Sequence, residues 1–358
     1  MDNSCEDGRS ITLSSYIAGV GYALPERVIS NDYFSSYLDT NDQWIIDRTG
    51  IRERRWVEPG VAASDLALPA CERALADAQL SPKDIDGIVV ATVTPDFIFP
   101  STACVIQAKL GARGFAFDVN AVCCGFLYAF SVAEGLIASG QARRVLVVGV
   151  DVYSTSMINH QDRGTCILFG DGAGAVVMSS AREFLEEDSS LKSAGPTFIQ
   201  GSPHSVRGVY NTVIGADGRY GHILKAEMGT ACPPTPEYVA EHRYHLQMEG
   251  REVFKLAVRT LSDINLQVVK NAGLSMSDID YLATHQANKR ILQSVAKQLE
   301  IPDDKVLLNV DRVGNTSSAS VPILLGEAKE QGKLKRGDLV ILSAFGGGVT
   351  WGASLVRW

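Results

Sequence analysis

The sequence of 358 residues predicts an α/β protein built from two related halves. Short apolar runs alternate with longer amphipathic ones along the chain, which is the pattern of βαβ units. Residues 78–86 resemble residues 272–280, and an apolar run typical of a strand follows each segment. Their separation far exceeds the roughly 20–50-residue periods of solenoid repeats. The sequence therefore indicates a duplicated half rather than a repeat array.

In the first half, residues 88–92 and 144–149 are predicted to be buried strands because both are short and apolar. Residues 117–122 are predicted to be a further strand, and the run that follows through Ile137 a helix ended by Gly140. The glycine-rich residues 170–174 precede another apolar run. Since no G-x-G-x-x-G opens a helix here, we interpret them as a hairpin rather than a phosphate loop.

The second half repeats this order. Residues 280–284 form an apolar strand, and the amphipathic residues 289–299 follow as a helix. Residues 308–313 parallel 117–122, and 338–343 parallel 144–149. We expect the halves to pack around a pseudo-twofold axis, which would place the functional site between them.

Residues 182–248 have no counterpart of similar length and are rich in glycine and proline. Such residues favour turns and irregular structure. We therefore divide the chain into a first half at 1–181, an excursion that walls a pocket at 182–248, and the remainder of the second half at 249–358.

Composition argues against several classes of protein, namely nucleic-acid-binding, membrane, disulfide-rich and metal-binding proteins. The net charge of −8 argues against broad binding to nucleic acid or to anionic membranes. The first ten residues are polar and no apolar run approaches about 18 residues, so a cytoplasmic protein without membrane insertion is expected. Seven cysteines without a C-x-x-C pair favour reduced thiols. No metal is expected, because His242 and His245 lack carboxylate support.

Candidate chemistry centres on adjacent cysteines, Cys123 and Cys124, between a predicted strand and a predicted helix. The free N–H groups of a helix start favour a thiolate and lower the pKa of a thiol from about 8.5. His285 follows a strand of the other half, at the end where open α/β sheets bind ligands. Asn315 occupies, within a residue, the position in the second half that the two cysteines occupy in the first half. The alternatives are a core cysteine, a structural histidine and a helix-capping asparagine.

Together, these residues resemble the β-ketoacyl-acyl-carrier-protein synthase III family of the thiolase superfamily. The resemblance runs over about 17–358 and covers eight motifs in the family's order. These are Trp44-Ile-Ile-Asp-Arg-Thr-Gly-Ile-Arg-Glu-Arg54, Cys123-Cys-Gly-Phe126, Asp162-Arg-Gly-Thr165, Phe169-Gly-Asp-Gly-Ala-Gly174, Glu252-Val-Phe-Lys255, His285-Gln-Ala-Asn288, Gly314-Asn-Thr-Ser317 and Phe345-Gly-Gly-Gly348.

The resemblance implies a thiolase-like fold, in which duplicated βαβαβαββ halves pack as a five-layer αβαβα sandwich. It implies a catalytic triad of Cys123, His285 and Asn315, with Cys123 as the nucleophile and Cys124 as a packing residue. Backbone N–H groups of Cys123 and Gly347 would form the oxyanion hole.

The resemblance also implies contacts with substrates and partners. Coenzyme A would be bound by Trp44, Arg48, Arg163 and Asn288. The acyl pocket would be lined by Phe345 and by Phe99, which in similar enzymes reaches across a dimer interface, so a homodimer is expected. Lys255, Arg290 and Lys297 would dock the acidic carrier protein.

The predicted activity is the decarboxylating condensation of an acyl-CoA primer with malonyl-acyl carrier protein, which initiates type II fatty acid synthesis. Coenzyme A thioesters serve as substrate, and no cofactor is expected. The alternatives are a secondary-metabolism synthase or an acyltransferase that uses the same triad. A two-cysteine thiolase is disfavoured because the last cysteine is Cys232. A non-catalytic subunit is disfavoured because all three triad residues are present.

Overall fold

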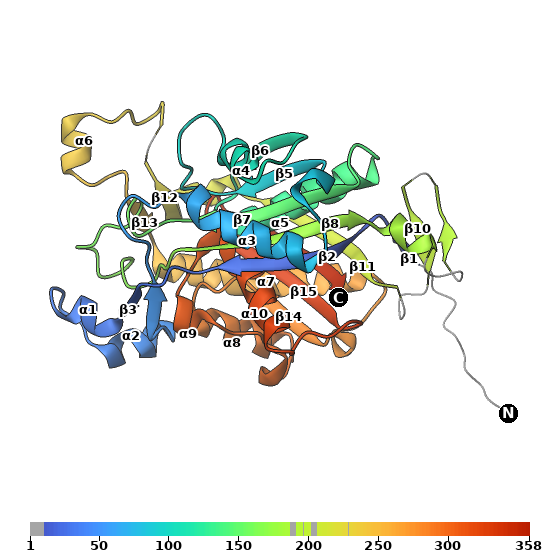
Figure 1. The fold of residues 1–358 in the computed structure, drawn as a ribbon. Helices are drawn as coiled ribbons and strands as arrows, with labels where there is room; N and C mark the ends of the chain where they lie inside the picture. Colours follow the sequence, from blue (N-terminus) through green and yellow to red (C-terminus); the bar gives the residue numbers. More distant parts are fainter. Residues whose placement is uncertain (1–10, 187–190, 196, 202–205, 228) are drawn as a thin grey trace.

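The computed structural model describes residues 11–186, 191–195, 197–201, 206–227 and 229–358. Within these residues the chain forms two central sheets with helices between and outside them (Figure 1). No helix in the described residues is long and apolar enough to cross a bilayer.

The first sheet has five strands in the order β2-β8-β7-β5-β6. Strand β5 runs parallel to β6 and β7, whereas β8 runs antiparallel to both β7 and β2. Almost every residue of β5, β7 and β8 is buried, which explains their near-continuous apolar sequences. The bounds are β2 (Ser15–Ala23), β5 (Gly87–Ala91), β6 (Phe115–Val119), β7 (Arg144–Asp151) and β8 (Gly172–Ser180).

The second sheet repeats this topology with the order β11-β16-β15-β14. The bounds are β11 (Gly208–Ala216), β14 (Tyr281–Thr284), β15 (Leu339–Gly346) and β16 (Thr350–Arg357). The position that β6 holds in the first sheet is reduced here to an isolated parallel bridge between Val306 and Leu282. The duplication predicted from the sequence is therefore present, with one strand shortened.

Six long helices complete five alternating layers. Helices α3 (Ala63–Asp77) and α4 (Thr102–Leu110) cover the outer face of the first sheet, and α7 (Gly250–Asn271) and α8 (Lys289–Gln298) cover that of the second. Helices α5 (Gly125–Ala138) and α10 (Ser320–Glu330) lie between the sheets. Helix α10 is buried along most of its length, as its central position requires. The predicted five-layer αβαβα sandwich is confirmed.

Shorter elements surround this core. The pairs are β3 (Val28–Ser30) with β4 (Glu53–Arg55) and β12 (Leu224–Ala226) with β13 (Leu246–Met248), and a small sheet joins β1 (Ile11–Leu13), β10 (Ile199–Gly201) and β9 (Lys192–Ser193). The short helices are α1 (Asn31–Ser35), α2 (Asp42–Thr49), α6 (Pro236–Ala240) and α9 (Val310–Val313).

Two sequence-based boundaries were wrong. Residues 182–248 are not one excursion, because β11 within them is an edge strand of the second sheet, paired with β16. Residues 170–174 are not a hairpin turn, because Gly172 and Gly174 already lie in β8. A Cβ atom on Gly174 would lie 2.7 Å from the backbone nitrogen of Ile323 in α10. These glycines therefore let the strand and the central helix approach closely.

The two halves also meet closely at the end of β7. A Cβ atom on Gly149 would lie 2.4 Å from the carbonyl oxygen of Ser318, in the short turn η7 (Ser317–Ala319) that precedes α10. The absence of a side chain at residue 149 brings this turn of the second half against the first sheet.

Candidate active site

A cavity of about 710 Å³ lies between the halves and is lined by all three predicted triad residues, Cys123, His285 and Asn315. Cys123 lies directly before α5, His285 directly after β14, and Asn315 in the segment between α9 and α10. The duplication thus brings the predicted residues together in one site.

Cys123 lies in the turn η2 (Val122–Cys124), directly before α5, and only 7% of its surface is exposed. Burial raises the pKa of the Cys123 thiol to about 12, and the negative charge of Asp151 also raises it. The sequence-based expectation of a lowered pKa for this thiol was therefore wrong. The start of α5 favours an anion, but loss of hydration at a buried sulfur outweighs it.

Cys124 is fully buried and does not line the cavity. Its Sγ atom lies 3.6 Å from the carbonyl oxygen of Ala344, and a Cβ atom on Gly352 would lie 3.2 Å from that sulfur. Cys124 therefore packs against the second sheet, which agrees with the predicted packing role.

His285 is held by its backbone and its ring. Its backbone N–H donates to the carbonyl oxygen of Ser343 at 2.7 Å, and its Nδ1 lies 2.6 Å from Ser320 Oγ. Burial lowers the pKa of His285 to about 4, so the imidazole is neutral near pH 7. We assign the Ser320 hydroxyl as the donor to Nδ1, which places the single proton of the neutral ring on Nε2 as a hydrogen-bond donor.

The Asn315 amide has a defined orientation. Its Oδ1 accepts the backbone N–H of Ser317 at 2.9 Å, so its NH₂ group is available as a donor to the cavity. Its backbone is fixed by a 2.8 Å hydrogen bond to the carbonyl oxygen of Leu168 and a 3.0 Å bond from the N–H of Gly170. Asn315 therefore accepts the N–H that begins η7 and also lines the cavity.

Beneath these residues, the buried Asp151 carboxylate joins the two halves. Its Oδ1 accepts from Val93 N at 2.9 Å and from the hydroxyls of Thr92 and Thr94. Its Oδ2 accepts from Ser318 N at 3.1 Å and Ser318 Oγ at 2.7 Å. Sequence reasoning missed Asp151, although its place at the end of an apolar strand was the available signal.

The four predicted coenzyme A contacts lie together in the cavity lining. The guanidinium carbons of Arg48 and Arg163 lie 4.1 and 4.6 Å from the Trp44 ring centroid. Asn288 donates to the carbonyl oxygen of Arg48 at 3.0 Å, and its Oδ1 caps α8 through Arg290 N. All four predicted residues line the cavity, and cations over an indole face form a surface suited to an aromatic base.

Of the three cationic residues predicted to dock the carrier protein, two line the cavity and one does not. Lys255 and Arg290 line the cavity, whereas Lys297 lies in the last turn of α8, outside the lining. Lys255 pairs with Glu252 at 2.9 Å, and both side chains are largely exposed.

The two predicted acyl-pocket aromatics are also separated. Phe345 is buried and lines the cavity, whereas Phe99 does not line it and has 84% of its surface exposed beside Ile98, which is 96% exposed. Gly347 lies in the turn between β15 and β16, where a Cβ atom would be 3.5 Å from Val122 beside the nucleophile.

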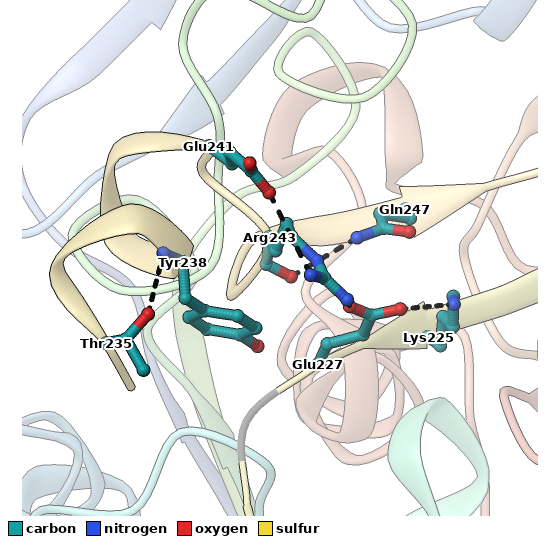
Figure 2. Close-up of polar contacts among 7 residues, drawn as sticks. All are labelled: Lys225, Glu227, Thr235, Tyr238, Glu241, Arg243 and Gln247. Carbon is teal, nitrogen blue, oxygen red and sulfur yellow. Dashed lines mark hydrogen bonds and ion pairs between the residues drawn. The ribbon is translucent and has the colours of Figure 1, made fainter. Parts of the chain in front are cut away.

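One wall of the cavity is apolar and is formed by Leu224, Leu246 and Met248 of the β12–β13 hairpin. Figure 2 shows how polar contacts tie the base of the segment between these strands. Glu227 accepts from Lys225 on one side and from Arg243 at 2.7 Å on the other. These ion pairs join the two ends of the segment to each other.

Within the part of the chain that the structure describes, no group of three His, Cys, Asp or Glu side chains could hold a metal ion.

The fold and the site together define a thiolase-fold enzyme class with a buried cysteine, a neutral histidine and an oriented asparagine. Two family models match, "3-Oxoacyl-[acyl-carrier-protein (ACP)] synthase III" over residues 117–195 and its C-terminal model over 269–358. The chain belongs to the β-ketoacyl-[acyl-carrier-protein] synthase III family.

Relatives extend over nearly the whole chain. The synthase III of Caldanaerobacter subterraneus is 43% identical over 97% of this chain and 98% of its own length. The crystal structure of the Aquifex aeolicus synthase III has a TM-score of 0.83 at 39% identity, covering 96% of this chain and all of that one. The priming β-ketosynthase of the R1128 polyketide pathway has a TM-score of 0.83 at 32% identity, covering 97% of each chain.

Proposed function

We propose that this protein condenses an acyl-CoA primer with malonyl-acyl carrier protein, releasing carbon dioxide and forming a β-ketoacyl-acyl carrier protein. This is the initiating step of type II fatty acid synthesis. The observation that carries the proposal is the meeting of Cys123, His285 and Asn315 in one cavity, with the amide held as a donor.

In the first half-reaction, the Cys123 sulfur attacks the thioester carbonyl of acyl-CoA. A carbon–sulfur bond to Cys123 forms, the bond to the coenzyme A sulfur breaks, and the thiol proton leaves on that sulfur. The acyl-enzyme divides a difficult condensation into two easier steps. Because burial raises the pKa of Cys123 to about 12, the sulfur needs hydrogen-bond donors as negative charge develops on it.

In the second half-reaction, malonyl thioester loses carbon dioxide and leaves an enolate. His285 and the Asn315 amide are neutral donors that can stabilise its oxygen without exchanging protons. The enolate carbon attacks acyl-Cys123, and the cysteine sulfur leaves and takes up a proton. The backbone N–H groups of Cys123 and Gly347 are proposed to stabilise the tetrahedral oxyanion.

Residues in and near the cavity lining support the binding of coenzyme A and of the acyl carrier protein. Trp44, Arg48, Arg163 and Asn288 are proposed to bind coenzyme A, and Lys255, Arg290 and Lys297 to dock the acidic carrier protein. A cytoplasmic homodimer is proposed, in which Phe99 of one chain reaches the acyl pocket of the other. Its exposure in the single chain supports this assignment.

A second candidate is a priming synthase of secondary metabolism with the same triad. The likeness to the R1128 priming ketosynthase supports it, because the same fold and a similar chain length accompany that role. The two candidates differ in the primer and the acceptor, which an assay with both can separate.

The test exposes the protein to a panel of acyl-CoAs and locates the adduct by mass spectrometry, with Cys123→Ser and Cys124→Ser variants as a matched pair. We expect an acyl group on Cys123 that persists in Cys124→Ser and is lost in Cys123→Ser. Malonyl-acyl carrier protein should then release carbon dioxide. An adduct on Cys124, or none, would refute the proposed nucleophile, and acylation of an alcohol or amine without carbon dioxide would support the acyltransferase alternative.

A further inference from the structure

We propose that Ser317 is a further catalytic residue, whose hydroxyl donates a hydrogen bond to the Cys123 sulfur, and that Tyr153 positions this hydroxyl by donating to its oxygen. The inference rests on the proposed role of Cys123 as the nucleophile. It gives a role to Ser317, which closes the Gly314-Asn-Thr-Ser317 motif, and adds Tyr153, which the sequence did not indicate.

The contacts allow one chain of donation, from Tyr153 to Ser317 and from Ser317 to Cys123. Ser317 Oγ lies 3.5 Å from Cys123 Sγ, a distance typical of a hydrogen bond to sulfur, and the Tyr153 hydroxyl lies 3.3 Å from Ser317 Oγ. A serine hydroxyl has a single hydrogen but can accept through its lone pairs. If that hydrogen points to the sulfur, the Tyr153 hydroxyl must donate to Ser317. Burial raises the pKa of Tyr153 well above its usual value, so the phenol keeps its proton.

Both hydroxyls are held rigidly. Tyr153 is 1% exposed, and its ring stacks on Phe169 with centroids 4.5 Å apart and planes 3° from parallel. Ser317 is fully buried, and its N–H is bound to Asn315 Oδ1. Its φ of +51° is uncommon for a residue other than glycine, which is a feature of conformations that the surrounding structure imposes. The turn therefore aims the hydroxyl at the nucleophile.

A donor at this position addresses a specific difficulty of the site. Negative charge develops on the sulfur twice, when it attacks the primer and when it leaves the acyl group. Burial and Asp151 both disfavour that charge, whereas the Ser317 hydroxyl lowers the pKa of Cys123. We call the hydrogen-bonded chain from Tyr153 through Ser317 to Cys123 the relay. It transfers no proton, because the thiol proton departs on the coenzyme A sulfur. Its contribution is electrostatic and preorganised.

The experiment measures the rate at which iodoacetamide alkylates Cys123, followed by peptide mass spectrometry, in Ser317→Ala, Tyr153→Phe and the double variant. A rise of one unit in the thiol pKa lowers the thiolate fraction tenfold, and the higher nucleophilicity of the more basic thiolate restores part of this. We expect alkylation about three- to fourfold slower in Ser317→Ala at pH 7, and about twofold slower in Tyr153→Phe.

The double variant gives the sharpest result. Because Tyr153 acts through Ser317, removing its hydroxyl should have no further effect once the serine hydroxyl is gone. Matched controls are Tyr128→Phe, which removes a phenol bonded to Gly215, and Ser262→Ala, which removes a buried hydroxyl of α7. Both should alkylate at the wild-type rate.

Wild-type alkylation in Ser317→Ala, or a twofold effect of Tyr153→Phe that persists in the Ser317→Ala background, would overturn the relay. If Ser317→Ala does not fold, Ser317→Gly removes the same hydroxyl and suits the positive φ. Alkylation does not require an acyl-CoA. A relay effect on alkylation without any acyl adduct on Cys123 would therefore refute the proposed function while supporting the relay.

Discussion

Replacing Asp151 with asparagine should make the protein less stable and its nucleophile more reactive. The Asp151 carboxylate accepts five hydrogen bonds, two from backbone N–H groups on opposite oxygens, those of Val93 and Ser318. An asparagine keeps one oxygen and places an NH₂ group at the other position. Whichever way the amide is turned, its NH₂ group therefore faces a buried backbone N–H, that of Val93 or that of Ser318, which loses its acceptor.

The magnitude follows from these contacts. A buried N–H left without an acceptor costs about 1–3 kcal/mol, and weaker bonds to the remaining oxygen add to this. We expect the free energy of unfolding to fall by about 3 kcal/mol. Because the Asp151 charge raises the pKa of the Cys123 thiol, its removal should lower that pKa and speed alkylation about two- to threefold at pH 7.

Urea denaturation followed by circular dichroism measures the stability, and iodoacetamide labelling of Cys123 measures the reactivity. With a urea m-value of roughly 3 kcal/mol/M, the midpoint should fall by about 1 M at unchanged slope. Glu134→Gln is the matched control for the alkylation rate, because it makes the same change at a carboxylate of α5 that accepts from Thr212 alone among the described contacts. Slower alkylation, or an unchanged midpoint, would refute the electrostatic reasoning about Asp151.

The remaining predictions concern decarboxylation and pH. His285→Ala and Asn315→Ala should each lower carbon dioxide release about 100-fold or more while acylation of Cys123 persists; equal loss of both half-reactions would contradict the assigned donor roles. Burial raises the pKa of Glu134 to about 7, above its unfolded value, so the stability that it contributes is complete below pH 4.5 and falls as pH rises through 7. Glu134→Gln should flatten the pH dependence of the urea midpoint over this range, and a parallel curve would contradict the assignment.

The sequence was sufficient for the architecture because the duplication repeats local patterns. Buried strands such as β7 are continuous apolar runs, and their counterparts recur in order. Strand β11 was missed because the glycine- and proline-rich sequence around it indicated loops, and its strand identity depends on pairing with β16. Edge pairing between distant segments leaves little trace in local sequence.

For the site, too, local sequence indicated the residues but not the properties that depend on tertiary contacts. Motifs located Cys123, His285 and Asn315, and the start of α5 suggested a lowered thiol pKa. The pKa of the Cys123 thiol is instead raised by burial between the two halves, which no local pattern encodes. The contacts of Tyr153 and Ser317 likewise exist only because residues 164 positions apart meet in the fold.

The close approach of Gly149 to Ser318 has a consequence for biosynthesis. The ribosome completes the first sheet long before it reaches the turn that covers the nucleophile. Until then, the nascent chain carries its cysteine without the second-half walls that later shield it from oxidants. Shielding of this thiol is therefore complete only after residues 317–319 have been translated, and chain termination upstream of that turn would leave a sulfur open to oxidative damage.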